Sequence, residues 1–157
     1  MAIARIVSGG QTGVDRAALD VAIRHCIPYG GWCPYGGWAE DLPHPPGVLT
    51  AYPELTETPS TDPAERTVWN VRDSDATLVL RAEGQVSAGT ALAATMAEHL
   101  GKPLLVADLN APDVIDSART WLSGLADQTV LNVAGPRESE TPGSYDKAVT
   151  VLEGVLQ

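Results

Sequence analysis

The feature that most constrains this fold is the alternation of short, largely apolar runs with amphipathic segments along the chain. The apolar runs predict buried strands at residues 3–7, 27–33, 75–81, 103–107 and 129–133. Helical patterns are expected at residues 12–26, 63–71, 87–100, 112–125 and 145–156. Strands that alternate with helices are joined by right-handed crossovers, so we expect an α/β fold with a mostly parallel sheet and helices on both faces.

An irregular segment at about residues 34–62 interrupts this alternation. Seven of the 12 prolines lie from Pro34 to Pro63, and they disfavour regular structure there. A stretch of this length inside a compact domain is usually a lid, a binding loop or a packed loop. The chain has 157 residues, the size of one ordinary domain. We therefore expect a single Rossmann-like domain over residues 1–157, with this proline-rich segment folded against it.

The balance of charge bears on the class of partner. Ten Lys and Arg against 20 Asp and Glu give a net charge of -10, which repels nucleic acid backbones. No apolar run is long enough to span a membrane. The N-terminus enters a strand pattern without a secretory leader, so we expect a cytoplasmic protein that binds neither nucleic acid nor membrane. A small anionic ligand remains compatible with this charge, because backbone N–H groups and local arginines can bind it.

The two cysteines do not indicate a metal or redox site. Cys26 and Cys33 are seven residues apart, with no CxxC motif and no companion pair of histidines. We expect both to be buried free thiols and predict no metal ligands.

Ligands of parallel α/β sheets bind beyond the carboxyl ends of the strands, so the residues that follow each strand are the candidates. The first such turn, residues 8–16, contains Gly9, Gly10 and Gly13, where bare backbone amides can approach a phosphate at a helix N-terminus. Arg16 in the first helical turn opposes the helix dipole, which an anion nearby would explain. The alternative is that Arg16 pairs with Asp20 on a solvated face.

Two further turns occupy the same kind of position. In residues 84–90, Ser87 or Thr90 can cap free amides or donate a hydroxyl to a phosphate, although an ordinary capped helix with a close-packing Gly89 would have the same sequence. Residues 132–139 offer Arg137, unless they form a simple surface turn. The three turns should meet at one edge of the sheet.

The predicted helix at residues 63–71 adds further candidate ligand-binding residues. Arg66 and Asn70 lie one helical turn apart with Thr67 adjacent, and they face either the same crevice or solvent. No spacing singles out a catalytic residue. The candidate ligand-binding residues are Gly9, Gly10, Gln11, Thr12, Gly13, Asp15, Arg16, Arg66, Thr67, Asn70, Asp73, Ser74, Ser87, Gly89, Thr90, Gly135, Pro136 and Arg137.

Several segments together resemble the molybdenum carrier protein family, and they span nearly the whole chain. They are residues 8–19, 30–34, 39–41, 66–67, 69–75, 89–90 and 132–139. That family is similar to the Rossmann-like superfamily that contains the lysine-decarboxylase-like phosphoribohydrolases and the DprA-type proteins. The resemblance implies a homo-oligomeric carrier of the molybdenum cofactor, a phosphorylated pterin.

Two departures from these relatives separate the possible functions. The family usually has Lys-Gly-Arg-Arg after Cys-Pro, whereas this chain has Tyr35-Gly36-Gly37-Trp38 and lacks those positive charges. Enzymes of the wider superfamily carry Pro-Gly-Gly-x-Gly-Thr and a catalytic Glu soon after, whereas this chain has residues 86–90 as Val-Ser-Ala-Gly-Thr and its first downstream carboxylate is Glu98. We therefore expect a carrier of a phosphorylated ligand, with a nucleotide-binding or nucleoside-monophosphate-cleaving enzyme as the alternative.

Overall fold

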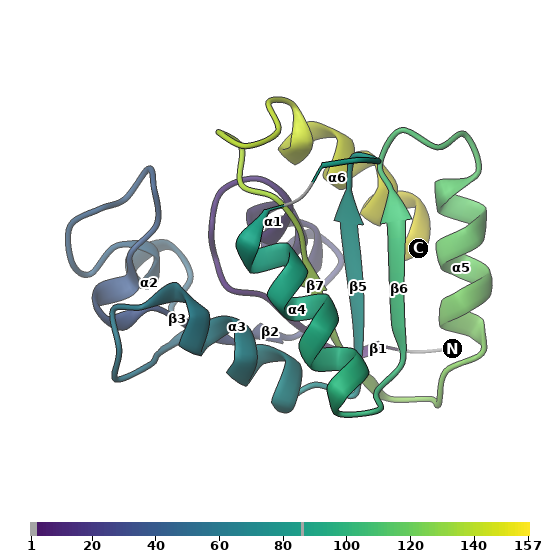
Figure 1. The fold of residues 1–157 in the computed structure, drawn as a ribbon. Coiled ribbons are helices and arrows are strands. Elements are labelled where there is room, and N and C mark those ends of the chain that lie inside the picture. The colour runs from purple at the N-terminus through teal and green to yellow at the C-terminus, as the bar shows by residue number, and fades with distance from the viewer. Residues whose placement is uncertain (1–2, 86) are drawn as a thin grey trace.

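The computed structural model describes residues 3–85 and 87–157 and confirms the predicted α/β fold. A parallel sheet of five strands has the order β2-β1-β7-β5-β6 (Figure 1). The strands are β1 (Ile3–Val7), β2 (Tyr29–Gly30), β5 (Ala76–Arg81), β6 (Leu104–Asp108) and β7 (Thr129–Ala134). Because all five run in one direction, the loops that follow β1, β5 and β7 leave the sheet at the same edge.

Helices cover both faces of the sheet, as predicted (Figure 1). One face packs against α1 (Val14–Arg24), α5 (Val114–Ser123) and α6 (Ser144–Val155), and these helices form the largest apolar core with the sheet. The other face packs against α3 (Pro63–Arg72) and α4 (Ala88–His99) around a smaller core. The core between α3 and α4 consists mainly of small side chains, which brings the two helices close together.

The helix boundaries follow from capping residues in the sequence. Asp62 caps α3 and its carboxylate accepts a hydrogen bond from the Ala64 N–H at 3.0 Å. Ser87 caps α4 in the same way and accepts from the Thr90 N–H at 3.2 Å. Such caps satisfy first-turn N–H groups that have no partner inside the helix.

The prediction of one strand at residues 27–33 is wrong, because the chain turns at Gly31. β2 joins the main sheet, whereas β3 (Trp32–Cys33) pairs with β4 (Thr56–Glu57) in a separate two-stranded sheet. Gly31 has a φ of +127°, and a Cβ there would lie 2.4 Å from the Ser8 carbonyl oxygen. Only glycine permits this contact without a shift of the backbone.

The proline-rich segment forms a small layer of its own beside the β2 edge of the sheet (Figure 1). It contains a 3-10 turn at Tyr35–Gly37, the short helix α2 (Val48–Ala51) and β4. Its apolar side chains pack onto α1 through a separate cluster made of Leu19, Cys33, Ala39, Val48 and Leu55. The segment is therefore a packed part of the fold.

The cysteines differ from each other in exposure. Cys33 is buried as predicted, and burial raises the pKa of its thiol to about 11, so it is unreactive near neutral pH. Cys26 is exposed, which corrects the prediction for that residue. It follows α1 with a φ of +55°, where the chain leaves the helix.

In residues 3–85 and 87–157, no group of three or more His, Cys, Asp or Glu side chains is arranged to hold a metal ion. None of the helices in this part of the chain has the length and apolar character needed to cross a bilayer.

The C-terminal end of α3 is held by a single lysine from the turn before β6. The Lys102 ammonium donates hydrogen bonds to the carbonyl oxygens of Arg72 at 2.5 Å, Ser74 at 2.7 Å and Val71 at 3.3 Å. A cation at this place also interacts favourably with the helix dipole. Lys102 thus holds the C-terminal end of α3 next to the start of β6.

Replacing Lys102 tests this anchor. We expect Lys102→Met to lower the free energy of unfolding by about 2 kcal/mol, because charged hydrogen bonds to three carbonyl groups are lost. The measurement is urea denaturation followed by circular dichroism. Lys147→Met is the matched control, since the exposed Lys147 ammonium donates one hydrogen bond to a described residue, to the Asn110 side chain, and we expect it to change stability by less than about 0.5 kcal/mol. Equal effects of the two variants would contradict the assignment.

Candidate functional site

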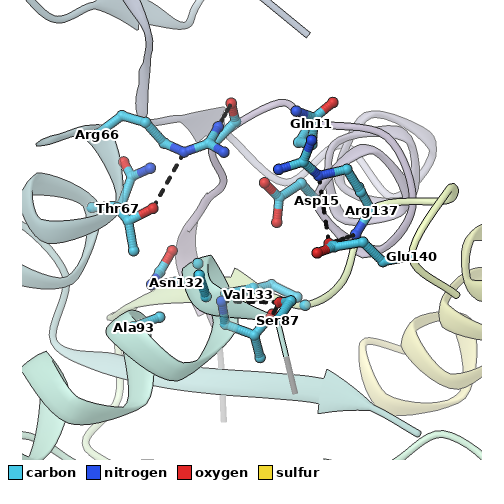
Figure 2. Close-up of a pocket in the computed structure, with 17 residues that line it drawn as sticks. Gln11, Asp15, Arg66, Thr67, Ser87, Ala93, Asn132, Val133, Arg137 and Glu140 are labelled. Carbon is cyan, nitrogen blue, oxygen red and sulfur yellow. Dashed lines mark hydrogen bonds and ion pairs between the residues drawn. The ribbon is translucent and has the colours of Figure 1, made fainter. Parts of the chain in front are cut away.

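A cavity of about 90 Å³ lies at the carboxyl edge of the sheet, where the loops after β1, β5 and β7 meet α3 (Figure 2). The three turns singled out in the sequence therefore do converge on one place. The structure brings these predicted residues to the cavity wall: Gly9, Gln11, Asp15, Arg66, Thr67, Asn70, Ser87, Gly89, Thr90, Gly135 and Arg137.

Other predicted residues lie elsewhere, and Arg16 is the most important of them. Its guanidinium forms two hydrogen bonds of 2.9 Å with the Asp41 carboxylate and also donates to the Gly10 carbonyl oxygen. The ion pair is therefore with Asp41 and not with Asp20, the partner that the helix spacing indicated. The predicted residues that do not line the cavity are Gly10, Thr12, Gly13, Arg16, Asp73, Ser74 and Pro136.

The β1–α1 and β7–α6 loops are in direct contact. The Val14 N–H donates to the Pro136 carbonyl oxygen at 3.3 Å, and the Glu138 N–H donates to the Thr12 hydroxyl at 3.0 Å. Gly13 makes this approach possible, because it has a φ of +78° and a Cβ there would lie 2.4 Å from the same carbonyl. Gly13 and Pro136 thus hold the two loops together next to the cavity without lining it.

Glu40 in the proline-rich segment ties these two loops together. Its carboxylate accepts hydrogen bonds from the hydroxyl groups of Thr12 and of Ser139, the latter at 2.5 Å, and from the Ser139 N–H at 3.3 Å. Gln85 connects the remaining loop: its amide donates to the Glu140 carbonyl at 2.5 Å and accepts from the Thr141 hydroxyl. All three loops are therefore held in place before any ligand arrives.

The Arg66 guanidinium is buried in the cavity wall, with the residue only 9% exposed. It donates to the Gly9 carbonyl oxygen at 2.8 Å and to the Thr67 hydroxyl at 3.3 Å. No described carboxylate forms an ion pair with it. Burial lowers the pKa of Arg66, but an arginine stays charged in proteins. The cavity therefore contains a buried positive charge whose neighbours do not neutralise it by direct pairing.

Gln11 supplies a second donor without a partner. Its Oε1 accepts hydrogen bonds from the Thr12 N–H at 3.0 Å and the Glu40 N–H at 2.9 Å, and these two bonds define which end of the amide is oxygen. Its Nε2 is buried and has no hydrogen-bond partner among the described residues. An unsatisfied buried donor costs about 1–3 kcal/mol, so a ligand atom that accepts from it would recover this energy.

The N-terminus of α4 forms another side of the cavity. The Ser87 hydroxyl caps the Thr90 N–H, whereas the N–H groups of Ala88 and Gly89 make no hydrogen bond to a described residue. A Cβ built on Gly89 would meet nothing within 4 Å, so the alternative of a glycine required for close packing is wrong. Free amides at a helix N-terminus can bind an anion.

Asp15 brings a negative charge into the same cavity. The residue is 7% exposed, and burial raises the pKa of its carboxyl group to about 6, although the nearby Arg66 charge acts in the opposite direction. Figure 2 shows the Asp15 carboxylate directed into the space between Arg66 and Arg137. Arg137 is paired with Glu140 at 3.5 Å and lies partly in solvent.

The sequence analysis missed six lining residues, of which only Asn132 and Glu140 have polar side chains; the other four are Ala88, Ala93, Val133 and Ala134. Asn132 is 3% exposed and its amide donates to the Thr77 hydroxyl at 3.4 Å. A polar residue between the apolar residues Leu131 and Val133 of the predicted strand was the available signal for it. Glu140 also lines the cavity, but nothing in its local sequence distinguishes it from other surface carboxylates.

The buried Asp15 carboxylate should reduce the stability of the fold. Because its pKa is about 6 in the folded protein against 3.8 for an ordinary Asp, the folded state loses stability as the pH rises from about 4 to 6. We expect Asp15→Asn to raise the free energy of unfolding by about 2 kcal/mol near pH 7.5. The gain should disappear near pH 4, where both side chains are neutral. Thermal melts at the two pH values measure this, and a variant that is destabilised at pH 7.5 would contradict it.

Comparisons with known proteins identify the family. Residues 6–156 match the model of the Circularly permutated YpsA SLOG family. No curated protein matches the chain. A crystal structure from Syntrophus aciditrophicus, described as a "Putative molybdenum carrier protein", is 43% identical, covers 99% of this chain and 96% of its own, and superposes with a TM-score of 0.87. The resemblance inferred from the sequence is therefore confirmed, and the chain belongs to the circularly permuted YpsA SLOG family.

Proposed function

We propose that this protein binds a phosphorylated small molecule in the cavity at the carboxyl edge of the sheet and carries it without chemical change. The observation that supports this most strongly is the buried Arg66 guanidinium, which faces the cavity and has no carboxylate partner among the described residues. A buried charge without an ion pair is costly, and an anionic ligand would offset that cost.

The other donors in the cavity support the same type of ligand. The Gln11 Nε2 and the amides of Ala88 and Gly89 join Arg66 around one space, and each can donate to a phosphate oxygen. Arg137 adds a charge at the solvent side. The donors come from separate elements whose loops are already hydrogen-bonded to one another, so binding needs little rearrangement.

The size of the cavity limits what it can enclose. Sites for whole drug-sized ligands measure about 300–1,000 Å³, whereas this cavity has about 90 Å³. It suits a phosphate group and the atoms attached directly to it. Gly89 and Glu140 are exposed and leave the rest of a larger ligand room to extend into solvent.

The molybdenum cofactor is our leading candidate for the cargo, because the similar Syntrophus protein is described as a molybdenum carrier. Its phosphate tail would occupy the cavity beside Arg66, with the pterin and its metal outside. Among the described lining residues there is no cysteine or histidine, so the metal would keep the ligands that it brings. A carrier role agrees with this donor set, which consists of groups that can bind a phosphate.

A nucleoside monophosphate is the second candidate, since its phosphate would use the same donors. Cleavage of the N-glycosidic bond would need a carboxylate near the ribose, and Asp15 is the buried carboxylate at this place. The two candidates differ in whether the bound molecule is changed.

Removing the Arg66 charge tests the phosphate site. We expect Arg66→Met to weaken binding of phosphate esters by about tenfold or more, since a charged hydrogen bond contributes about 1.5–3 kcal/mol. Isothermal titration calorimetry with ribose 5-phosphate and with inorganic phosphate gives the measurement. Arg16→Met is the matched control, because Arg16 is bound to Asp41 outside the cavity. The affinity of this variant for the two ligands should stay within about twofold of the wild-type value. An unchanged affinity of the Arg66 variant would overturn the proposal.

A direct assay separates the carrier from the enzyme. We expect the protein to slow the oxidative loss of released molybdenum cofactor relative to serum albumin, and Arg66→Met to remove this protection. A panel of nucleoside monophosphates incubated with the protein should release no free base. Base release that depends on Asp15 would replace the carrier proposal with the enzyme, and protection no better than that of albumin would remove the cofactor as cargo.

A further inference from the structure

Asp15 is an acidic residue in the wall of a cavity that we propose to bind an anion. A site for a bare oxyanion alone would not need a carboxylate there. Its main-chain carbonyl accepts the Ser8 hydroxyl at 2.8 Å, which fixes the start of α1, and the Gln11 N–H near its carboxylate acts to lower the pKa of that group. No described side chain donates to this carboxylate or pairs with it, although it lines the cavity and is almost fully buried. The Asp15 carboxylate therefore has acceptor capacity left over.

The charges around Asp15 do not explain its presence. Arg66 on α3, Arg16 on α1 and Arg137 on the β7–α6 loop all act on it through space, but the first two donate to main-chain carbonyl groups or to Asp41, and Arg137 pairs with Glu140. A carboxylate in this position repels a bare oxyanion that approaches the same arginines. The carboxylate can therefore accept a further hydrogen bond, and no described side chain donates one to it.

Gln11 stands beside Asp15 with the opposite chemistry. Its Nε2 is a buried donor without a partner, and the two side chains line the same cavity (Figure 2). A donor and an acceptor side by side are complementary to a ligand that has an acceptor atom and a hydroxyl or N–H close together. A phosphate ester with a nearby hydroxyl has this pattern, and sulfate or a simple alkyl phosphate lacks the donor.

We propose that Asp15 makes the cavity selective for phosphate esters that carry a hydroxyl or N–H donor next to the phosphate, and discriminates against bare oxyanions. The inference depends on the proposed phosphate site and assigns its selectivity to one residue. In a bound complex the donor of the ligand hydrogen-bonds to the Asp15 carboxylate while Gln11 and Arg66 contact the phosphate. Bare oxyanions would gain the same phosphate contacts but would meet the Asp15 charge.

The test compares three anions by isothermal titration calorimetry near pH 8: sulfate, methyl phosphate and ribose 5-phosphate. The wild-type protein should bind ribose 5-phosphate about tenfold more tightly than methyl phosphate, which corresponds to one charged hydrogen bond. In Asp15→Ala, which has no acceptor, the preference should fall below about twofold. In Asp15→Asn, sulfate and methyl phosphate should bind about tenfold more tightly than in the wild type, because the like charge is gone.

A matched control removes a negative charge elsewhere on the same surface. Asp41→Asn makes the same change of net charge, but Asp41 lies outside the cavity and pairs with Arg16. We expect this variant to keep the tenfold preference for ribose 5-phosphate. If it shifts the three affinities as Asp15→Asn does, the selectivity arises from overall charge and the inference is overturned.

The failure of this inference can be told apart from failure of the phosphate site. If phosphate esters bind through Arg66 but both Asp15 variants keep the preference, Asp15 is not the selective residue and the site stands. If none of the three anions binds to the wild-type protein, both proposals are overturned. Adenosine monophosphate and dihydroneopterin phosphate, titrated in the same way, distinguish a ribose hydroxyl from the donors of a pterin ester as the source of the hydrogen bond.

Discussion

The hydrogen bond from the Arg66 guanidinium to the Gly9 carbonyl oxygen is the contact on which the geometry of the cavity depends. It joins α3 to the β1–α1 loop and keeps a positive charge buried beneath that loop. A Cβ at Gly9 would lie 2.6 Å from Nη1 of Arg66, so any other residue at this position would displace the guanidinium from its place. The loop thus takes its shape from a charge on a helix 57 positions away in the sequence.

The charges that line the cavity sum to zero when all are ionised, since Arg66 and Arg137 are matched by Asp15 and Glu140. The proposed attraction for anions therefore does not depend on an excess of basic side chains, in agreement with the net charge of -10 for the whole chain. It comes from where the charges lie: Arg137 and Glu140 pair near the solvent, whereas Arg66 is buried without a paired carboxylate. The free amides at the start of α4 and the buried side-chain amide of Gln11 add partial positive charge at short range.

The alternation of strands and helices along the chain, the Ser87 cap of α4 and the convergence of three loops were predictable from the sequence, whereas the order of the strands in the sheet and the break at Gly31 were not. The predictable features follow from local patterns and from the rule that parallel strands end at one edge. Arg16 was misplaced because its partner Asp41 belongs to the proline-rich segment, whose path has no local periodicity. The sequence also contains no sign that Glu40 connects two loops, because its partner Ser139 is 99 positions away in the chain.

The bonds that Glu40 makes also bear on how a ligand reaches the cavity. The proline-rich segment cannot swing away from the β1–α1 and β7–α6 loops without breaking the bonds from Thr12 and Ser139 and uncovering its own apolar cluster. This arrangement favours entry and exit on the opposite side, past the exposed Gly89 and Glu140. For the proposed ligand, release by this route would not require the packed proline-rich segment to open.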